Sequence, residues 1–217
     1  MQVRDVSKRY GRQWAVRHLD LELTAGGLLV VEGHNGAGKS TLLGLLGGAI
    51  RPTEGQIFIL GEDLNRHSRR DQVRSMIATL PHRPFVYPDL TAREQLIFAA
   101  KLRGVTIEAE RRERLLTRVG LQAAAHRRIS TYSRGMIQRL ALASLMVQEA
   151  PIWLLDEPST GLDPIGRELL ATLIEEALGS NKSVVLVSHS PRVWDHLATQ
   201  RLALNGGRVK ASSAEAA

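Results

Sequence analysis

The chain has 217 residues and a formal net charge of +7, and it contains no cysteine. The lack of cysteine excludes disulfides and thiolate metal sites. No apolar run reaches the roughly 18 residues that a membrane-spanning helix needs, and no charged-then-apolar leader opens the chain. We therefore expect one domain, with at most a subdomain, in the cytoplasm.

Much of the positive charge lies between Arg66 and Arg128. Such a balance is compatible with nucleic acid, an anionic membrane face or a nucleotide as the partner. No aromatic residues are interleaved with the basic runs, as a stacking platform for bases would require. The sequence therefore favours solvated helix faces and predicts no nucleic-acid partner.

The first 31 residues predict three strands, and apolar residues at 19, 21 and 23 alternate cleanly in the second. Tyr10 lies between the first two strands. Its ring can stack on a base or pack at the end of a strand, and both alternatives are open.

A glycine-rich segment follows the third predicted strand, 28–32, and matches the phosphate-loop pattern G-x-x-x-x-G-K-S/T. The apolar stretch behind it predicts a buried helix, whose first N–H groups and dipole favour a bound phosphate. Lys39 is expected to reach the terminal phosphates of the nucleotide, and the Ser40 hydroxyl to bind Mg²⁺. The candidate loop consists of Gly33, His34, Asn35, Gly36, Ala37, Gly38, Lys39, Ser40 and Thr41.

After this helix, strands and helices alternate up to a proline-marked loop. The predicted elements are a strand at 55–60, a short basic helix at 66–75, a strand at 77–80 and the loop at 81–88.

Two helices then interrupt the alternation. Thr91 and Glu94 predict a capping box at the start of the first helix, and Gly120 predicts a left-handed cap at the end of the second, 107–119. We expect residues 85–135 to form an inserted helical subdomain.

The remainder returns to alternating elements, which favours an α/β fold with a mostly parallel sheet. We expect a nucleotide-binding core of residues 1–84 and 136–210 and a disordered tail at 211–217. The predicted elements are a helix at 136–148, a strand at 152–155, a helix at 164–178, a strand at 183–188 and a hairpin at 201–210.

The strand at 152–155 runs into two carboxylates, Asp156 and Glu157. Asp156 can hold Mg²⁺, and Glu157 can orient or deprotonate an attacking water. Alone, such a pair would more simply cap a helix. Together with a phosphate loop, it favours an ATP-hydrolysing site.

At these motifs the sequence resembles the ATP-binding cassette (ABC) ATPases over essentially its whole length. Residues 154–163, LLDEPSTGLD, are similar to the family's strand, catalytic glutamate and dimer-contact loop. Residues 133–136, SRGM, followed by Gln138 and Arg139, resemble its signature motif. His189 ends a strand where the family has its switch histidine, and Tyr10 falls where the family stacks adenine.

The resemblance implies a P-loop NTPase (RecA-like) fold with a mostly parallel sheet, an N-terminal antiparallel β subdomain and the inserted helical subdomain. It also implies a head-to-tail homodimer that binds ATP between the phosphate loop of one subunit and Ser133 and Gly135 of the other. The catalytic residues it implies are Lys39, Glu157 and His189.

The sequence departs from the family pattern at two places. Arg134 and Met136 stand where the signature has glycine and glutamine. His82 stands where the family has a loop glutamine that contacts Mg²⁺ and senses the membrane subunit. By this position, the predicted metal set is Ser40, Asp156 and His82. Because an imidazole is a poorer ligand than an amide oxygen for a hard cation, the replacement puts the coupling of ATP hydrolysis to the membrane subunit in question.

Three functions are open at this point. The chain can be the ATPase of an ABC transporter, peripheral on the cytoplasmic face of the inner membrane and bound to separate integral membrane subunits. It can be a soluble ABC ATPase that acts on a scaffold, as in iron–sulfur cluster assembly. A role on nucleic acid is disfavoured by a single cassette without a long coiled coil.

The apolar loop 85–88 could receive a helix of a membrane partner or pack in the core. Within the transporters, the compact length, the loop Pro-His-Arg-Pro and the signature Tyr-Ser-Arg-Gly are similar to the ATPase subunit of the haem exporter of cytochrome c maturation.

Overall fold

The computed structural model describes residues 1–211, with the side chains of His67, Lys210 and Ala211 left out. The predicted disordered tail, apart from the backbone of Ala211, lies outside the described residues. None of the helices in this described part combines the length and the apolar character that a bilayer crossing demands. Backbone contacts divide the chain into two compact units: unit 1 holds residues 1–79, 150–157 and those from 175 onward, and unit 2 holds residues 80–149 and 158–174.

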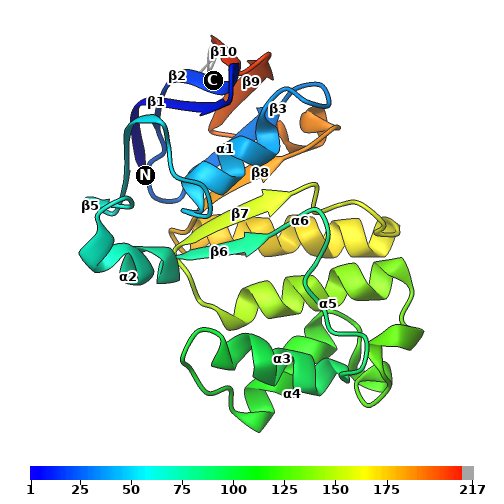
Figure 1. Ribbon diagram of the computed structural model, residues 1–217. Coiled ribbons are helices and arrows are strands. Elements are labelled where there is room, and N and C mark those ends of the chain that lie inside the picture. Colours follow the sequence, from blue (N-terminus) through cyan, green and yellow to red (C-terminus); the bar gives the residue numbers. More distant parts are fainter. Residues whose placement is uncertain (212–217) are drawn as a thin grey trace. The chain divides into compact units, whose positions relative to one another are not determined.

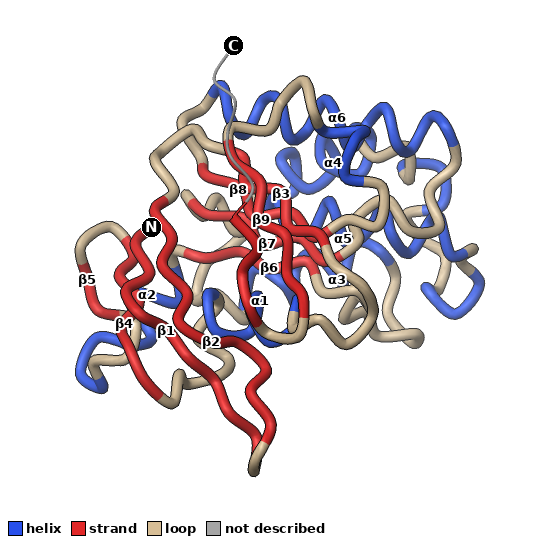
Figure 2. The backbone as a smooth tube through the Cα atoms, turned by 90° about the horizontal axis from the view of Figure 1, so that it is seen from above, coloured by secondary structure: helices blue, strands red, loops and turns tan. Residues whose placement is uncertain are grey.

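Unit 1 contains an antiparallel sheet in the order β2-β1-β4-β5, as the sequence predicts for the N-terminal region (Figure 2). Val3 and Val6 of β1 are both buried although they are three residues apart, because the strand has an irregularity between them, where Asp5 has φ +47°. The strands are β1 (Gln2–Tyr10), β2 (Gln13–Glu22), β4 (Glu54–Ile59) and β5 (Glu62–Asp63).

The second sheet has the order β10-β9-β3-β8-β7-β6, and its central strands are parallel. Nearly every residue of β3, β7 and β8 is buried, as is typical of parallel strands that are covered on both faces. A mostly parallel sheet is therefore confirmed. The strands are β3 (Leu28–Glu32), β6 (Ile77–Leu80), β7 (Ile152–Asp156), β8 (Ser183–Val187), β9 (Gln200–Asn205) and β10 (Arg208–Ala211).

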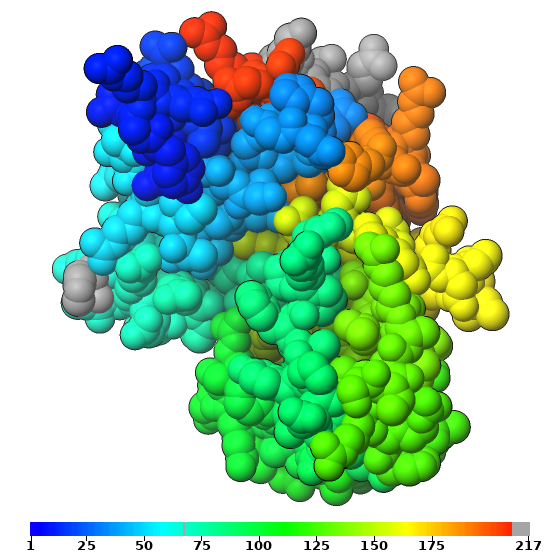
Figure 3. Space-filling view, turned by 45° about the vertical axis from the view of Figure 1, so that its right-hand side comes forward, coloured from blue at the N-terminus to red at the C-terminus, as the bar shows by residue number. Residues whose placement is uncertain are grey.

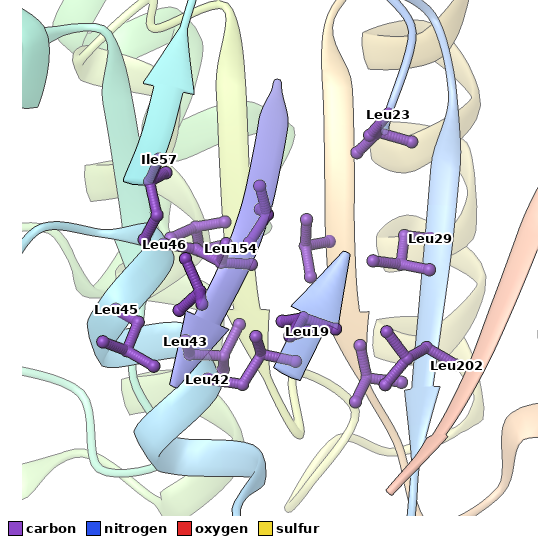
Figure 4. Packing of buried hydrophobic residues seen from close by; sticks show 14 of the residues in the cluster. Leu19, Leu23, Leu29, Leu42, Leu43, Leu45, Leu46, Ile57, Leu154 and Leu202 are labelled. Atoms are coloured by element: carbon purple, nitrogen blue, oxygen red, sulfur yellow. The ribbon is translucent and has the colours of Figure 1, made fainter. Parts of the chain in front are cut away.

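Helix α1 (Lys39–Leu46) is anchored in the core of unit 1 by four buried leucines (Figure 4). These leucines pack with Leu19, Leu29 and Leu154 of three different strands. Burying one such side chain is worth about 1.5–3 kcal/mol, so the start of α1 and the loop before it rest on a well-packed base. The four residues are Leu42, Leu43, Leu45 and Leu46.

Unit 2 is built from α3 (Ala92–Lys101), α4 (Ala109–Arg118) and α5 (Arg134–Val147) (Figure 1). The predicted capping box is present: the Thr91 side chain accepts from the Glu94 backbone N–H, and the Glu94 carboxylate accepts from the Thr91 N–H. Helix α5 supplies Leu140, Ala143 and Val147 to the core of this unit. The backbone contacts thus group α5 with the helices, whereas the sequence pattern alone placed 136–148 with the nucleotide-binding core.

Of the remaining elements, the helix predicted at 164–178 is present as α6, one residue longer, and the others are short. The predicted basic helix at 66–75 consists of a 3₁₀ turn followed by six α-helical residues. The elements are α2 (Arg70–Ser75), α6 (Pro164–Gly179) and the 3₁₀ turns η1 (His67–Arg69), η2 (Gln122–Ala124), η3 (Ile129–Thr131) and η4 (Pro191–Trp194).

Candidate functional site

Three predicted motifs of unit 1 lie at one edge of the parallel sheet. Strand β8 pairs with β3 on one side and with β7 on the other, so Val31, Val187 and Asp156 form one row across the sheet. Because the strands are parallel, all three lead out of this row at the same edge. The edge therefore brings together the phosphate loop, His189 after β8, and the carboxylates after β7 (Figure 1).

The phosphate loop requires glycine for two physical reasons. Gly38 has φ +109°, and a Cβ on it would lie 2.2 Å from the carbonyl oxygen of Ala15 in β2. Gly38 is also the N-cap of α1 and supplies no side-chain cap. The first N–H groups of α1 thus lack an intrahelical partner and a side-chain acceptor from the cap residue, which is the arrangement that accepts a phosphate.

Lys39 lies across its own loop. Its Nζ donates to the carbonyl oxygens of Gly33 at 2.6 Å and His34 at 3.1 Å. An ammonium group has three donors, so one remains available for an anion that enters the loop. His34 completes the loop's contacts, with Nδ1 2.7 Å from the Asn35 carbonyl oxygen and Nε2 3.3 Å from the Asn205 side-chain oxygen.

Glu157 is a buried carboxylate in an unusual backbone conformation. Its residue exposure is 6%, and its φ is +51°, a region that non-glycine residues rarely adopt and that recurs at functional sites. Its N–H donates to the Val187 carbonyl oxygen at 3.0 Å, which extends the β7–β8 ladder past the strand end. Within the described residues, Oε1 has no hydrogen-bond partner, and His189 Nε2 lies 3.4 Å from it.

These observations decide whether the residues fit ATP and Mg²⁺. The uncapped N-terminus of α1 and the Lys39 ammonium suit a polyphosphate, and the buried Oε1 of Glu157 is an acceptor that awaits a proton donor such as water. Ser40, at the start of α1, and Asp156, at the end of β7, provide hydroxyl and carboxylate oxygens, which Mg²⁺ prefers. The residues of unit 1 fit both groups.

Tyr10 is the last residue of β1 and is 51% exposed. Lys8 Nζ lies 5.2 Å from its ring centroid. The ring is therefore not packed in the core, which leaves it able to stack on a base.

The signature-like residues begin α5 in unit 2. Ser133 is the N-cap of this helix, and its Oγ accepts from the Met136 N–H at 3.2 Å. A Cβ on Gly135 would lie 3.0 Å from the Gly161 carbonyl oxygen, so glycine allows the loop that contains Gly161 to approach the helix.

His82 lies in unit 2 and lines a cavity of about 380 Å³ together with Arg83 and Arg134. Its predicted role as a Mg²⁺ contact stays a prediction. Two guanidinium groups at the same cavity favour an anion there over a cation.

The sequence placed Gln138 directly behind the signature-like residues but gave it no role of its own. It is 5% exposed, and its Nε2 donates to the Pro158 carbonyl oxygen at 2.8 Å, directly after Glu157 in the chain. A polar residue on the apolar side of α5 is the signal that could have identified it, because buried amides are retained where they have partners.

Comparison with known proteins agrees with this geometry. Residues 16–160 match the family model described as ABC transporter. A bacitracin transport ATP-binding protein of Bacillus licheniformis is 36% identical over 85% of this chain, and the match spans 60% of that longer protein. A cytochrome c biogenesis ATP-binding export protein of Nitrosococcus oceani is 36% identical over 87% of this chain and 85% of its own length.

A solved structure shows the same fold. A dimeric ATP-binding cassette in a post-hydrolysis state, bound to ADP and Pi, superposes with a TM-score of 0.87 and is 26% identical over 100% of this chain and 99% of its own. The ABC family, the P-loop fold and the capacity to bind ATP, which the sequence predicts, are thereby confirmed. The chain belongs to the ABC transporter family and is one of its ATP-hydrolysing, ATP-binding cassette proteins.

Proposed function

We propose that this chain is the motor subunit of an exporter whose membrane-spanning subunits are separate polypeptides. The observation that most supports an ATP-driven motor is the row Val31–Val187–Asp156, which leads the phosphate loop, His189 and Glu157 out of one edge of the sheet. ATP hydrolysis needs a phosphate cradle, a group for the attacking water and a group near the transferred phosphate at one place. This edge offers all three.

Each residue has a distinct task in this proposal. The phosphate loop and Lys39 bind the β- and γ-phosphates of ATP through N–H and ammonium donors, and Tyr10 stacks on the base. Glu157 Oε1 accepts a hydrogen bond from the attacking water, which it orients or deprotonates. His189, 3.4 Å from that oxygen, holds the water or the γ-phosphate from the other side.

Mg²⁺, when bound, neutralises the charge that develops on the phosphate oxygens. Ser40 and Asp156 are the residues that would hold it. His82 is a third proposed contact, through the loop that follows β6.

The proposed assembly is a head-to-tail homodimer on the cytoplasmic face of the inner membrane. Ser133 and Gly135 of one copy would complete the nucleotide site of the other, because the N-terminus of the 14-residue helix α5 can receive an anion. The dimeric structure with ADP and Pi supports this assembly.

Export is the direction that one relative suggests, since it is named for cytochrome c biogenesis export. We propose haem or a related molecule for cytochrome c biogenesis as one candidate cargo, on the strength of that relative and the Tyr-Ser-Arg-Gly signature. No finding supports a scaffold-assembly ATPase, and a transporter is favoured.

The decisive experiment is Glu157→Gln. The amide keeps the shape of the side chain but cannot take a proton, so turnover is expected to fall about 10²–10⁴-fold while ATP affinity changes little. ATP turnover is measured beside equilibrium ATP binding, and sizing chromatography is expected to show an ATP-bound dimer.

Glu54→Gln is the matched control, since Glu54 is an exposed glutamate of β4 in the same unit. Its turnover should equal that of the unchanged protein. Normal hydrolysis by Glu157→Gln would remove Glu157 from the mechanism and overturn the task proposed for it.

A further inference from the structure

The helical unit contains a cavity of about 380 Å³, and His82 is the one lining residue with a proposed part in the nucleotide site. Two arginines, a histidine, a threonine and an amide supply its polar lining, and Pro84 and Ile137 supply apolar walls. No aspartate or glutamate lines it, within the described residues. The lining residues are His82, Arg83, Pro84, Arg134, Ile137, Gln138 and Thr160.

Arg83 and Arg134 differ from the other arginines of unit 2. Across residues 80–149 and 158–174, these are the two arginines whose side chains have no ion pair, hydrogen bond or ring contact. Five of the other arginines form ion pairs with carboxylates. The remaining five donate to other oxygen atoms or have another interaction. Those paired with a carboxylate are Arg93, Arg111, Arg112, Arg114 and Arg128, and those with other partners are Arg103, Arg118, Arg127, Arg139 and Arg167.

Both of these exposed arginines thus line one cavity whose lining has no carboxylate. Two like charges at one site repel each other, and an anion placed between them removes the repulsion and supplies acceptors for their N–H groups. The pairing of the neighbouring arginines indicates that this unit has carboxylates available and that none serves these two.

Arg134 is exposed, and one side of its stem lies against Gly161. The Cγ, Cδ and Nε atoms of its stem would lie 2.9–3.1 Å from a Cβ on Gly161, so the side chain crosses closely over this glycine. The start of the same loop is bound by Gln138 through the Pro158 carbonyl oxygen at 2.8 Å. A stem in contact on one side has less conformational freedom to lose when the guanidinium binds a ligand.

We propose that this cavity binds a phosphate group, either free inorganic phosphate or the phosphate of a small nucleotide. Guanidinium groups bind phosphate oxygens bidentately, and the Thr160 hydroxyl and the His82 ring add further hydrogen bonds. Binding itself does not depend on the proposed ATPase mechanism. A role in receiving the phosphate that ATP hydrolysis releases rests on that proposed function.

The test is a titration with inorganic phosphate, followed by calorimetry or phosphorus NMR. The phosphate loop also binds phosphate, so the titration is made in a Lys39→Ala background. Arg83→Met and Arg134→Met each remove one guanidinium and keep an unbranched stem, and each is expected to raise the dissociation constant about tenfold or more. Arg114→Met, which removes an exposed arginine of α4, is the matched control and should change it less than twofold.

A second titration with AMP separates the two sources of the phosphate group. Binding of inorganic phosphate alone assigns the cavity to the free ion, and binding of both ligands with the same dependence on the two arginines assigns it to phosphate esters as well. Arg134→Lys tests whether the loss in Arg134→Met comes from the missing charge or from a change in the loop. It keeps the charge, so it should bind phosphate more tightly than Arg134→Met, with a thermal unfolding temperature equal to that of the background protein.

The proposal is wrong if the Lys39→Ala protein does not bind phosphate, or if Arg83→Met and Arg134→Met bind it as the background does. Neither result concerns ATP binding or hydrolysis by the protein with Lys39 in place. Failure of this proposal is therefore distinguishable from failure of the proposed function. In the space-filling view of Figure 3, residues of about 80–149, which include the cavity residues other than Thr160, are drawn in shades of green.

Discussion

The sheet edge of unit 1 and the start of α5 in unit 2 hold their functional residues in different ways. At the sheet edge, backbone pairing does it: Val31 and Asp156 both pair with Val187. At the start of α5, single side chains do it, such as Gln138 on the Pro158 carbonyl oxygen. A substitution at the first region should therefore change chemistry and leave the geometry, whereas one at the second should change the geometry itself.

The two regions also differ in charge. The sheet edge combines an ammonium group with two carboxylates, as a site for a nucleotide and a metal ion requires. The cavity of unit 2 has two guanidinium groups and no carboxylate. A cavity lined by arginines and no carboxylate suits an anion that binds without a metal ion.

The largest effect that tests this comparison is expected from Lys39→Met. The substitution removes a charged donor that lies over the phosphate loop, at a position whose backbone is fixed by α1. A hydrogen bond to a charged group is worth about 1.5–3 kcal/mol, so the dissociation constant for ATP should rise about 10–150-fold. Equilibrium ATP binding measures it.

Thermal unfolding without nucleotide is the control for Lys39→Met and should be unchanged. A clear loss of stability would show that the loop's geometry depends on the lysine side chain, and would break the contrast between the two regions.

A smaller effect, now on stability, is expected from Gln138→Leu. Leucine is close in size to glutamine but leaves the Pro158 carbonyl oxygen without its donor, which costs about 1–3 kcal/mol for a buried group. Denaturant unfolding measures the loss. ATP turnover should fall as well, because Pro158 directly follows Glu157.

Gln122→Leu supplies the comparison for this change, since Gln122 is an exposed glutamine of the same unit. It should be nearly neutral in both assays. Full turnover by a destabilised Gln138→Leu protein would contradict the link between this bond and Glu157.

The smallest effect is expected from Glu113→Gln on α4. Hydrogen bonds from Arg93, at 2.7 and 2.9 Å, hold the pKa of the Glu113 carboxyl below its ordinary value. A lowered pKa stabilises the fold at pH values above the unfolded pKa, and this contribution is lost as pH falls through the folded pKa. Both partners are partly exposed, so water screens the pair and the effect is modest.

The melting temperature of Glu113→Gln should thus be slightly lower than that of the unchanged protein at about pH 7, and the two should converge below about pH 4. A difference that persists in acid would mean that Glu113 acts through packing and not through its charge.

Several structural features follow from neighbouring residues and were predicted correctly. The capping box of Thr91 and Glu94 involves residues three apart. The buried strand before Asp156 and the hairpin at 200–211 also depend on local patterns. Helix 136–148 was predicted as an element, but its packing was not, because its apolar face alone does not say which core it joins.

The sequence by itself determined which motifs make up the proposed nucleotide site: a phosphate loop, a strand that ends in two carboxylates and a histidine after the next strand. These motifs can be recognised because each is made of consecutive residues. Only the tertiary structure decided that β8 lies between β3 and β7, that Glu157 is buried beside His189, and that Arg83 and Arg134 share a cavity without a carboxylate. Strand order, burial and the partners of a charge depend on residues far apart in the chain, and no local pattern of the sequence records them.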